Sequence, residues 1–296
     1  MPGLESDHLN ALAHNLHARY LVMALLALFL SNLLGAAQWR LLLVRQGVSM
    51  SYMEILKIYF MGLFFNNFMP GNVGGDVKRV ADIRIESGKH LGAGIAATVF
   101  DRVFGLFFLN ALALSVGAMF FIWDPRKSPF LLPSLGVFCC FCILFAALFS
   151  RRFGRWTERI YARFLPEKLV ARFASLRDRF HLFRNRKLWL QVFLISAVTQ
   201  SLRVSVHWLC GLAIGVNIAV SWYFYFIPIV AVITAVPISI GGFGVREASA
   251  VFLFKQVGVA PMDSVVVQLL AYFVALAVSI LGGFEFLFHR KKAPST

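Results

Sequence analysis

Long apolar stretches restrict the fold of this chain more than any other feature. Residues 130–149 carry no charge at all, and further long apolar runs cover residues 20–37, 93–123, 188–216 and 265–288. A run of about 18 or more apolar residues is long enough to cross the hydrocarbon core of a bilayer as one helix. Hydrophobic residues make up 59% of the 296 residues, against roughly 45–50% in soluble domains. We therefore predict an all-α polytopic membrane protein with about five full spans.

Two short segments of the chain resemble each other. Residues 70–79 read PGNVGGDVKR and residues 237–246 read PISIGGFGVR, so both have the form P-x3-G-G-x3-R, and both follow an apolar run. A Gly-Val pair precedes each proline at nearly equal spacing, with Gly47 lying 23 residues and Gly215 lying 22 residues upstream. Broken helices at corresponding positions of two halves are typical of a transporter's binding site.

Charge predicts the orientation of these two segments. Residues 151–187 contain twelve Arg or Lys and three acidic residues, a net charge of +9, and residues 289–292 are also basic. Basic clusters beside spans mark the cytoplasmic side of a membrane. If both clusters lie on that side, each repeated segment lies at the tip of a re-entrant helical hairpin, which enters and leaves the membrane from the same face. The two hairpins then open to opposite faces. We predict a single transmembrane domain over residues 1–296 in an inverted-repeat arrangement, with one half at about 20–123 and the other at about 188–288.

The basic segment itself has helical periodicity. Its apolar residues keep helical spacing on both sides of Pro166. We expect two amphipathic helices on the membrane surface with their basic side chains toward anionic headgroups, and the alternative is a solvated linker with charged faces. Because the net charge of +15 is concentrated beside membrane spans, we expect membrane lipids as partners, and no nucleic acid.

The residue types of the repeated segments suit an anion site. Proline ends the incoming helix, the two glycines allow a tight turn, and the returning helix presents free N–H groups and its positive dipole end. Arg79 or Arg246 lies one to two turns further on, where a guanidinium is able to bind a phosphate with two hydrogen bonds. Nearby asparagines and Ser239 add donors. The alternative is a purely structural kink in each segment. A single copy of the motif would favour that alternative over a binding site.

Charged residues also interrupt the apolar spans. A charge at the membrane centre costs about 2.5–3.5 kcal/mol on insertion scales, so such residues usually face the interior of a bundle. Asp101 and Arg102 lie inside one span, and either they line a lipid path or they form structural ion pairs, Asp101 with Arg79 and Arg102 with Asp76. Arg203 is a second intramembrane cation, with Glu247 as its candidate partner across the bundle.

Residue patterns of enzymes and metal sites are missing from the sequence. It contains no phosphate-binding loop, no G-x-S-x-G and no H-E-x-x-H. Cys139, Cys140, Cys142 and Cys210 all lie in apolar runs, which favours small buried hydrophobic residues over a disulfide or a metal site. We expect no catalytic residue, no metal and no cofactor.

Three segments together resemble a known family. They are F-x-N-x-x-P-G-N-V-G-G-D-x-x-R ending at Arg79, then Phe100-Asp101-Arg102, then PISIGGFGVRE at residues 237–247. The pattern is similar to the lysylphosphatidylglycerol synthase transmembrane-region family, a flippase-like domain, over about residues 20–288. The resemblance implies the handling of a charged lipid, such as an aminoacylated phospholipid or a polyprenyl-phosphate-linked sugar.

The resemblance also implies a set of site residues, to which the residue patterns add Arg203 and Ser239. The substrate-binding candidates are Asn67, Pro70, Gly74, Gly75, Asp76, Arg79, Asp101, Arg102, Arg203, Pro237, Ser239, Gly241, Gly242, Gly244, Arg246 and Glu247. Two features depart from the family pattern. The family often has an additional span before the first one here, and the second-half counterpart of Arg102 falls near Gln268, which is uncharged.

These observations favour an inner-membrane lipid flippase or transporter in a bacterial cytoplasmic membrane. The anionic headgroup of a phospholipid or lipid phosphate would bind near the midplane, and residues 151–187 and the C-terminus would be cytoplasmic. One alternative is an accessory or scaffold subunit of a membrane lipid-modifying transferase, which the basic segment would dock. Another is a membrane-embedded transferase that uses the hairpin sites for a lipid-phosphate donor.

Overall fold

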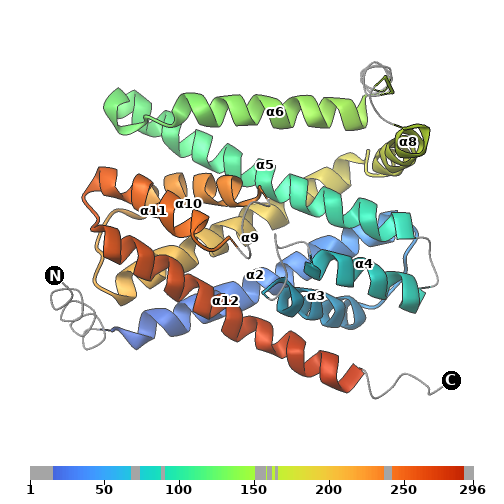
Figure 1. The fold of residues 1–296 in the computed structure, drawn as a ribbon, viewed down its shortest axis with the longest axis horizontal. Helices are drawn as coiled ribbons and strands as arrows, with labels where there is room; N and C mark the ends of the chain where they lie inside the picture. The colour runs from blue at the N-terminus through green and yellow to red at the C-terminus, as the bar shows by residue number, and fades with distance from the viewer. Residues whose placement is uncertain are drawn as a thin grey trace.

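The computed structural model describes residues 16–67, 74–87, 91–150, 158, 162–163, 166–236 and 242–289, and within these ranges the chain forms helices and no strand. Figure 1 shows these helices with the long axis of the molecule horizontal. The α-helices are α2 (Ala18–Arg45), α3 (Tyr52–Asn66), α4 (Gly74–Ser87), α5 (Leu91–Trp123), α6 (Leu131–Phe149), α8 (Glu167–His181), α9 (Arg186–Ala213), α10 (Val220–Thr234), α11 (Val245–Phe254) and α12 (Pro261–His289), with two short 3₁₀ turns, η1 (Pro125–Lys127) and η2 (Lys255–Val257).

Five of these helices are long and apolar enough to cross a membrane, which confirms an all-α polytopic membrane fold. They are α2, α5, α6, α9 and α12. By contrast, α3 and α10 have 15 residues each, which gives a length of about 22 Å, whereas the hydrocarbon core is about 30 Å thick. Such lengths suit helices that stop part of the way across a bilayer. Re-entry of the two hairpins into the membrane stays a prediction.

The described helices repeat along the chain. Adding 168 to both ends of α2 reaches both ends of α9, and the same offset carries α3 onto α10. The chain leaves α2 and α9 in the same way. Gly47 and Gly215 have φ angles of 79° and 82°, and the amides of Val48 and Val216 each bond to the carbonyl five residues earlier. This left-handed glycine cap is one of the common ways to end a helix, and its duplication confirms the matched Gly-Val pairs.

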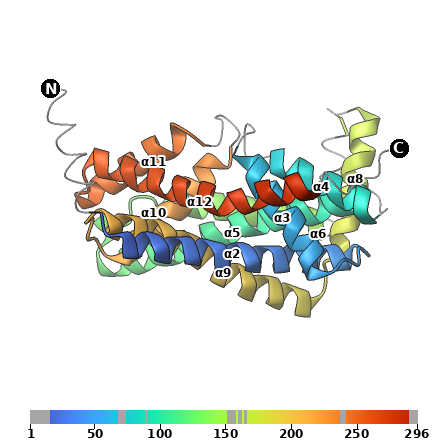
Figure 2. The ribbon, with the colours of Figure 1, turned by 90° about the horizontal axis from the view of Figure 1, so that it is seen from below.

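The packing follows the same two-fold pattern. The partners α2 and α9 pack against each other in the centre, α12 packs on α3, and α5 packs on α10, so each half's long last helix covers the other half's hairpin. The hairpin α3–α4 lies at one end of the long axis and α10–α11 at the opposite end in both views (Figures 1 and 2). The inverted orientation of the two halves across a membrane stays a prediction.

The described helices form two apolar cores, and each core contains residues of both halves. In one, buried Trp39, Phe100 and Phe183 pack together with residues of α3 and α9. In the other, Tyr223 and Phe254 pack with residues of α5, α9 and α12. Large aromatic side chains dominate both cores because they bury the most surface per residue.

One prediction outside the repeats needs correction. Cys210 is buried as expected, but Cys139, Cys140 and Cys142 are exposed, because α6 packs mainly against α5 and α8 and leaves most of its surface free. The amphipathic helix α8 exists, with Phe180 buried in the protein core and Leu169 and Phe173 exposed, and its position on a membrane surface stays a prediction. The other expected surface helix lies largely outside the described residues.

The crossing of α12 over α3 depends on a glycine that the sequence patterns did not single out. A Cβ atom on Gly282 would overlap the carbonyl oxygen of Phe60 and lie 2.8 Å from the amide nitrogen of Met61. The two backbones therefore touch, as is common where small residues line helix contacts in membranes.

We expect Gly282→Ala to lower the stability of the detergent-solubilised protein by about 1–3 kcal/mol, because the added methyl overpacks this contact. Gly136→Ala on α6 is the control, since nothing lies within 4 Å of a Cβ there. Thermal unfolding of both variants measures the difference. Equal melting temperatures would contradict the contact between α3 and α12.

Candidate functional site

Four of the predicted charges meet in one network. Arg79 Nη1 lies 3.4 Å from Asp76 Oδ1, and Arg79 Nη2 lies 3.9 Å from Asp101 Oδ2. Arg102 forms an ion pair with the other oxygen of Asp76. Both ion pairs that the sequence suggested are therefore present, and they join α4 to α5.

Aromatic rings enclose the central cation of this network. The guanidinium carbon of Arg79 lies 4.0 Å from the ring centroid of Trp39 and 4.4 Å from that of Tyr59, and the residue is only 5% exposed. A cation over a ring face is stabilised by the ring quadrupole, by up to about 2 kcal/mol when water is excluded. Gly62 makes room for this arrangement, because a Cβ there would lie 2.5 Å from Arg79 Cγ.

Neutral side chains extend the network into the second half of the chain. Gln38 Nε2 donates to Asp101 Oδ1 at 2.9 Å, and Ser196 Oγ donates to Gln38 Oε1 at 2.8 Å. Arg203 Nη2 donates to the Tyr59 hydroxyl at 3.3 Å. Helix α9 thus contributes Ser196 and Arg203 to a site that is otherwise built from the first half.

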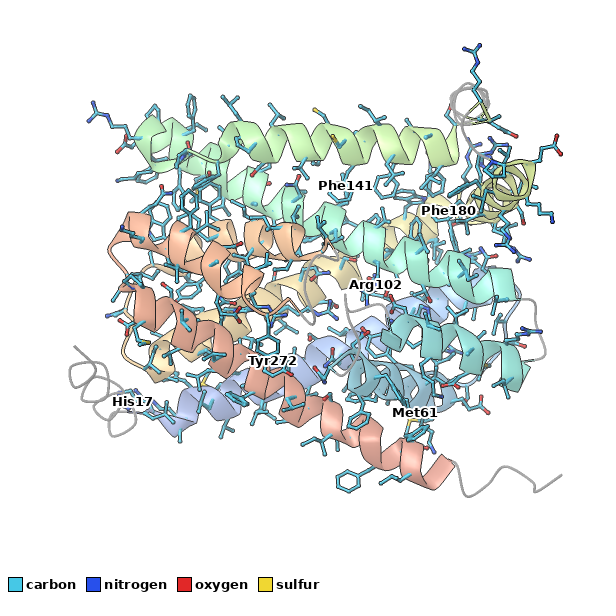
Figure 3. All side chains as sticks on the ribbon, in the orientation of Figure 1. His17, Met61, Arg102, Phe141, Phe180 and Tyr272 are labelled. Carbon is cyan, nitrogen blue, oxygen red and sulfur yellow. The ribbon has the colours of Figure 1, made fainter. Side chains whose placement is uncertain are left out.

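The members of the network differ in exposure. The side chains of Arg79, Asp76 and Asp101 are 7%, 12% and 14% exposed, whereas that of Arg102 is 41% exposed. Arg102 lies near the middle of the molecule (Figure 3). Removing one partner of a buried ion pair leaves an uncompensated charge, which costs about 3–5 kcal/mol. Breaking one of the buried pairs would therefore destabilise the fold, and Arg102 is the most exposed member of the network.

The start of α4 is partly occupied by the protein's own groups. The amide of Gly75 donates to Asn66 Oδ1 at 2.8 Å, and Asp76 lies in the first turn, where a negative charge offsets the helix dipole. An anion at this helix start would thus compete with Asn66 and Asp76. Pro70, a further candidate, lies outside the described residues.

The remaining first-half candidates have structural positions. Gly74 begins α4. Asn67 Nδ2 donates to Ser279 Oγ at 2.7 Å and so joins the end of α3 to α12. A Cβ on Gly75 would overlap the carbonyl oxygen of Gly62, so both glycines are needed where α3 and α4 approach each other.

The second hairpin has a similar start. Gly242 and Gly244 have φ angles of 81° and 79°, and the Gly244 amide donates to Glu247 Oε2 at 2.7 Å. Arg246 lies within electrostatic reach of Glu247, Tyr272 and His207. Three further candidates, Pro237, Ser239 and Gly241, lie outside the described residues.

The predicted pairing of Arg203 with Glu247 is wrong. Arg203 donates to Tyr59, and Glu247 accepts from the start of its own helix. Local sequence patterns do not rank the possible partners of Arg203, because the choice depends on how α9 packs against α3.

Sequence reasoning also missed three members of the site. Gln38 and Ser196 are polar residues within or beside apolar runs, and that pattern could have identified them. Tyr59 has no local pattern that distinguishes it. In the second half, Gln268 is fully buried, and neither atom of its amide has a partner among the described residues. Within the described part of the chain, no group of three His, Cys, Asp or Glu side chains is placed to hold a metal.

We expect Asp76→Asn to destabilise the protein by about 3–5 kcal/mol, because Arg79 and Arg102 then lose their shared counter-charge. The control is Glu285→Gln, which breaks the exposed Lys57–Glu285 pair of 2.9 Å and should cost no more than about 1 kcal/mol. Denaturation in detergent measures both. The network has no structural role if the two variants lose the same stability.

Relatives of the chain are membrane proteins. It is 23% identical to a UPF0104 membrane protein of Methanothermobacter thermautotrophicus, over 82% of this chain and 76% of the relative. It is also 23% identical to a UPF0104 membrane protein of Pyrococcus horikoshii, over 92% of this chain and 88% of that relative. No solved structure shows a significant match.

A family model matches almost the entire chain. The match covers residues 4–283 and is to the family described as the lysylphosphatidylglycerol synthase TM region. It includes both hairpins and every residue of the charged network. The chain therefore belongs to the lysylphosphatidylglycerol synthase transmembrane-region family.

Proposed function

We propose that the protein is a lipid flippase or transporter. Its substrate would be an anionic or aminoacylated phospholipid, or a polyprenyl-phosphate-linked lipid. One observation carries the proposal, namely a network of mutually neutralised charges on α4 and α5 that is bonded through Gln38 to Ser196 of the second half, in a molecule whose two hairpins lie at opposite ends. Intramembrane ionisable residues gather on substrate pathways, and paired hairpins typically surround the substrate.

The network contains both cations and anions, so its members are able to exchange ion-pair partners with a charged headgroup. A phosphate is able to replace Asp76 as the counter-charge of Arg102, which is the exposed end of the network. The released carboxylate is then free to accept from an ammonium or hydroxyl group of the headgroup. Asp76 keeps its ion pair with Arg79, and an ammonium group on the headgroup would offset the charge that the phosphate adds.

The two halves supply a route for alternating access. A headgroup bound between α4 and α5 is close to α9 through Tyr59 and Arg203, so both halves contact the same site. Rocking of one half against the other would expose it first to one face and then to the other. The acyl chains would remain in the bilayer, and a lipid or ion gradient would supply the drive.

We expect the purified protein in vesicles to accelerate movement of a fluorescent phosphatidylglycerol between leaflets, and Arg102→Ala to slow it at least tenfold. Arg102 is preferred over Arg79 because its partial exposure limits the effect on folding. Lys127→Ala is the control, since this exposed residue lies in η1 at the outer edge of the helices. Chemical quenching of the outer-leaflet label measures the rate.

A protein that moves no labelled anionic lipid under any gradient would contradict the flippase. That result would favour the accessory role, for which the basic helix α8 has a docking face with Leu169 and Phe173 exposed. Formation of a lipid product by the purified protein would instead favour a transferase.

The proposed orientation places α8 and the end of α12 in the cytoplasm of the cell, with η1 outside. These elements lie at opposite ends of the long axis (Figures 1 and 2). The basic residues of α8 would then face the cytoplasmic leaflet, in line with the positive-inside rule.

Cysteine labelling tests this orientation. In a background with the four native cysteines replaced, Lys127→Cys should react with an impermeant maleimide on intact cells. Lys168→Cys at the start of α8 should react only after the cells are permeabilised. The opposite pattern would invert the topology.

A further inference from the structure

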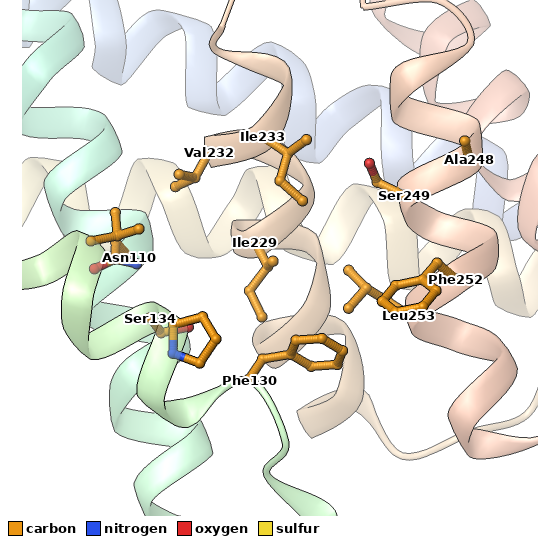
Figure 4. Close-up of a pocket in the computed structure, with 12 residues that line it drawn as sticks. Asn110, Phe130, Ser134, Ile229, Val232, Ile233, Ala248, Ser249, Phe252 and Leu253 are labelled. Carbon is orange, nitrogen blue, oxygen red and sulfur yellow. The ribbon is translucent and has the colours of Figure 1, made fainter.

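A groove on the side of the bundle has no part in the charged network. It lies between α5, α6, α10 and α11 and has a volume of about 460 Å³ (Figure 4). Ile229 and Ile233 line it from α10, and Phe252 lines it from α11. Cavities of about 300–1,000 Å³ are the usual size of small-molecule sites.

The groove opens toward the surroundings of the bundle. Phe252 and Ile233 are 64% and 40% exposed, and α6, which forms one wall, leaves most of its surface free. In a membrane, this surface faces lipid chains. A hydrocarbon chain is thus able to enter from the side.

One polar group in the groove is poorly satisfied. Asn110 is only 3% exposed, and its Oδ1 atom has no hydrogen-bond partner among the described residues. Ser134 and Ser249 also contribute to the lining. A buried polar atom without a partner is destabilising, so the site suits a ligand that brings a polar atom as well as apolar surface. A bare hydrocarbon would leave Asn110 unpaired.

The groove continues from the second hairpin. Ala248 and Ser249 of α11 line it, and they directly follow Arg246 and Glu247. The groove therefore begins beside the second hairpin, whereas the headgroup of the proposed function lies at Arg102 in the first half.

We propose that the groove binds one acyl chain of an anionic phospholipid, with Asn110 hydrogen-bonding the glycerol-ester region where the chain begins. This inference rests on the proposed function, because the headgroup is the one bound at the hairpins. It adds that the protein selects its lipid by chain as well as by charge. The headgroup and the chain occupy separate parts of the structure and are separable by substitution.

Photocrosslinking tests the chain site. The full-length protein is placed in vesicles with phosphatidylglycerol whose acyl chain carries a diazirine, and crosslinked peptides are mapped. Peptides of α10 and α11 should be labelled at least threefold more than with phosphatidylcholine carrying the same chain. Equal labelling by the two lipids would mean that bulk lipid fills the groove, and would overturn the inference.

Two substitutions that fill the groove, one on α10 and one on α11, give the second measurement. Ile233→Trp and Ser249→Phe should each reduce labelling of α10 and α11 at least fivefold. Leu287→Trp is the control, because this side chain is 62% exposed on α12, away from the groove. Gel filtration identifies any variant that fails to fold, and two variants on different helices guard against that failure. Full labelling in both folded variants would overturn the chain site.

A soluble probe separates this inference from the proposed function. Binding of the short-chain dihexanoyl phosphatidylglycerol should weaken at least fivefold in Arg102→Ala and stay unchanged in Leu287→Trp. If Arg102→Ala weakens binding while groove-filling leaves crosslinking intact, the chain site is wrong and the headgroup site stands. If Arg102→Ala leaves binding unchanged, the headgroup assignment is wrong.

Discussion

Charge held at membrane depth has to be neutralised by its neighbours, and the surroundings of Arg79 are arranged to do this. Its guanidinium lies between two aromatic rings and is paired with Asp76 and Asp101. The arrangement needs α3 and α4 to approach closely, and Gly62 and Gly75 make that approach possible. Because the partners come from α2, α3, α4 and α5, the network also fixes the position of these helices relative to one another.

The two halves are more alike in the positions of their helices than in their charged and polar residues. Equal offsets relate α2 to α9 and α3 to α10, and the glycine caps after α2 and α9 share their hydrogen bonds. The charged network, however, belongs to the first half, while the second half holds Arg246 near His207 and a buried Gln268 whose amide has no partner among the described residues. In our proposal the first half binds the headgroup at Arg102 and the second half guides an acyl chain.

Much of the fold could be predicted from local patterns, because run length and periodicity decide where a membrane helix begins and ends. The spans, the two hairpins and the repeat all follow from such patterns. Of the site, the pairs Arg79–Asp101 and Arg102–Asp76 could be named as alternatives. The partner of Arg203 could not, and neither could the exposure of the three cysteines on α6, since both depend on which helices pack together.

The sequence by itself determined that the chain is a helical membrane protein made of two similar halves, since apolar length and repeated motifs are properties of contiguous residues. Only the tertiary structure decided which polar and charged side chains meet. Gln38 bonds to Asp101, 63 residues away, and to Ser196, 158 residues away. Such contacts depend on the crossing of α2 with α5 and α9, and a crossing is set by the packing of whole helix faces rather than by any single motif.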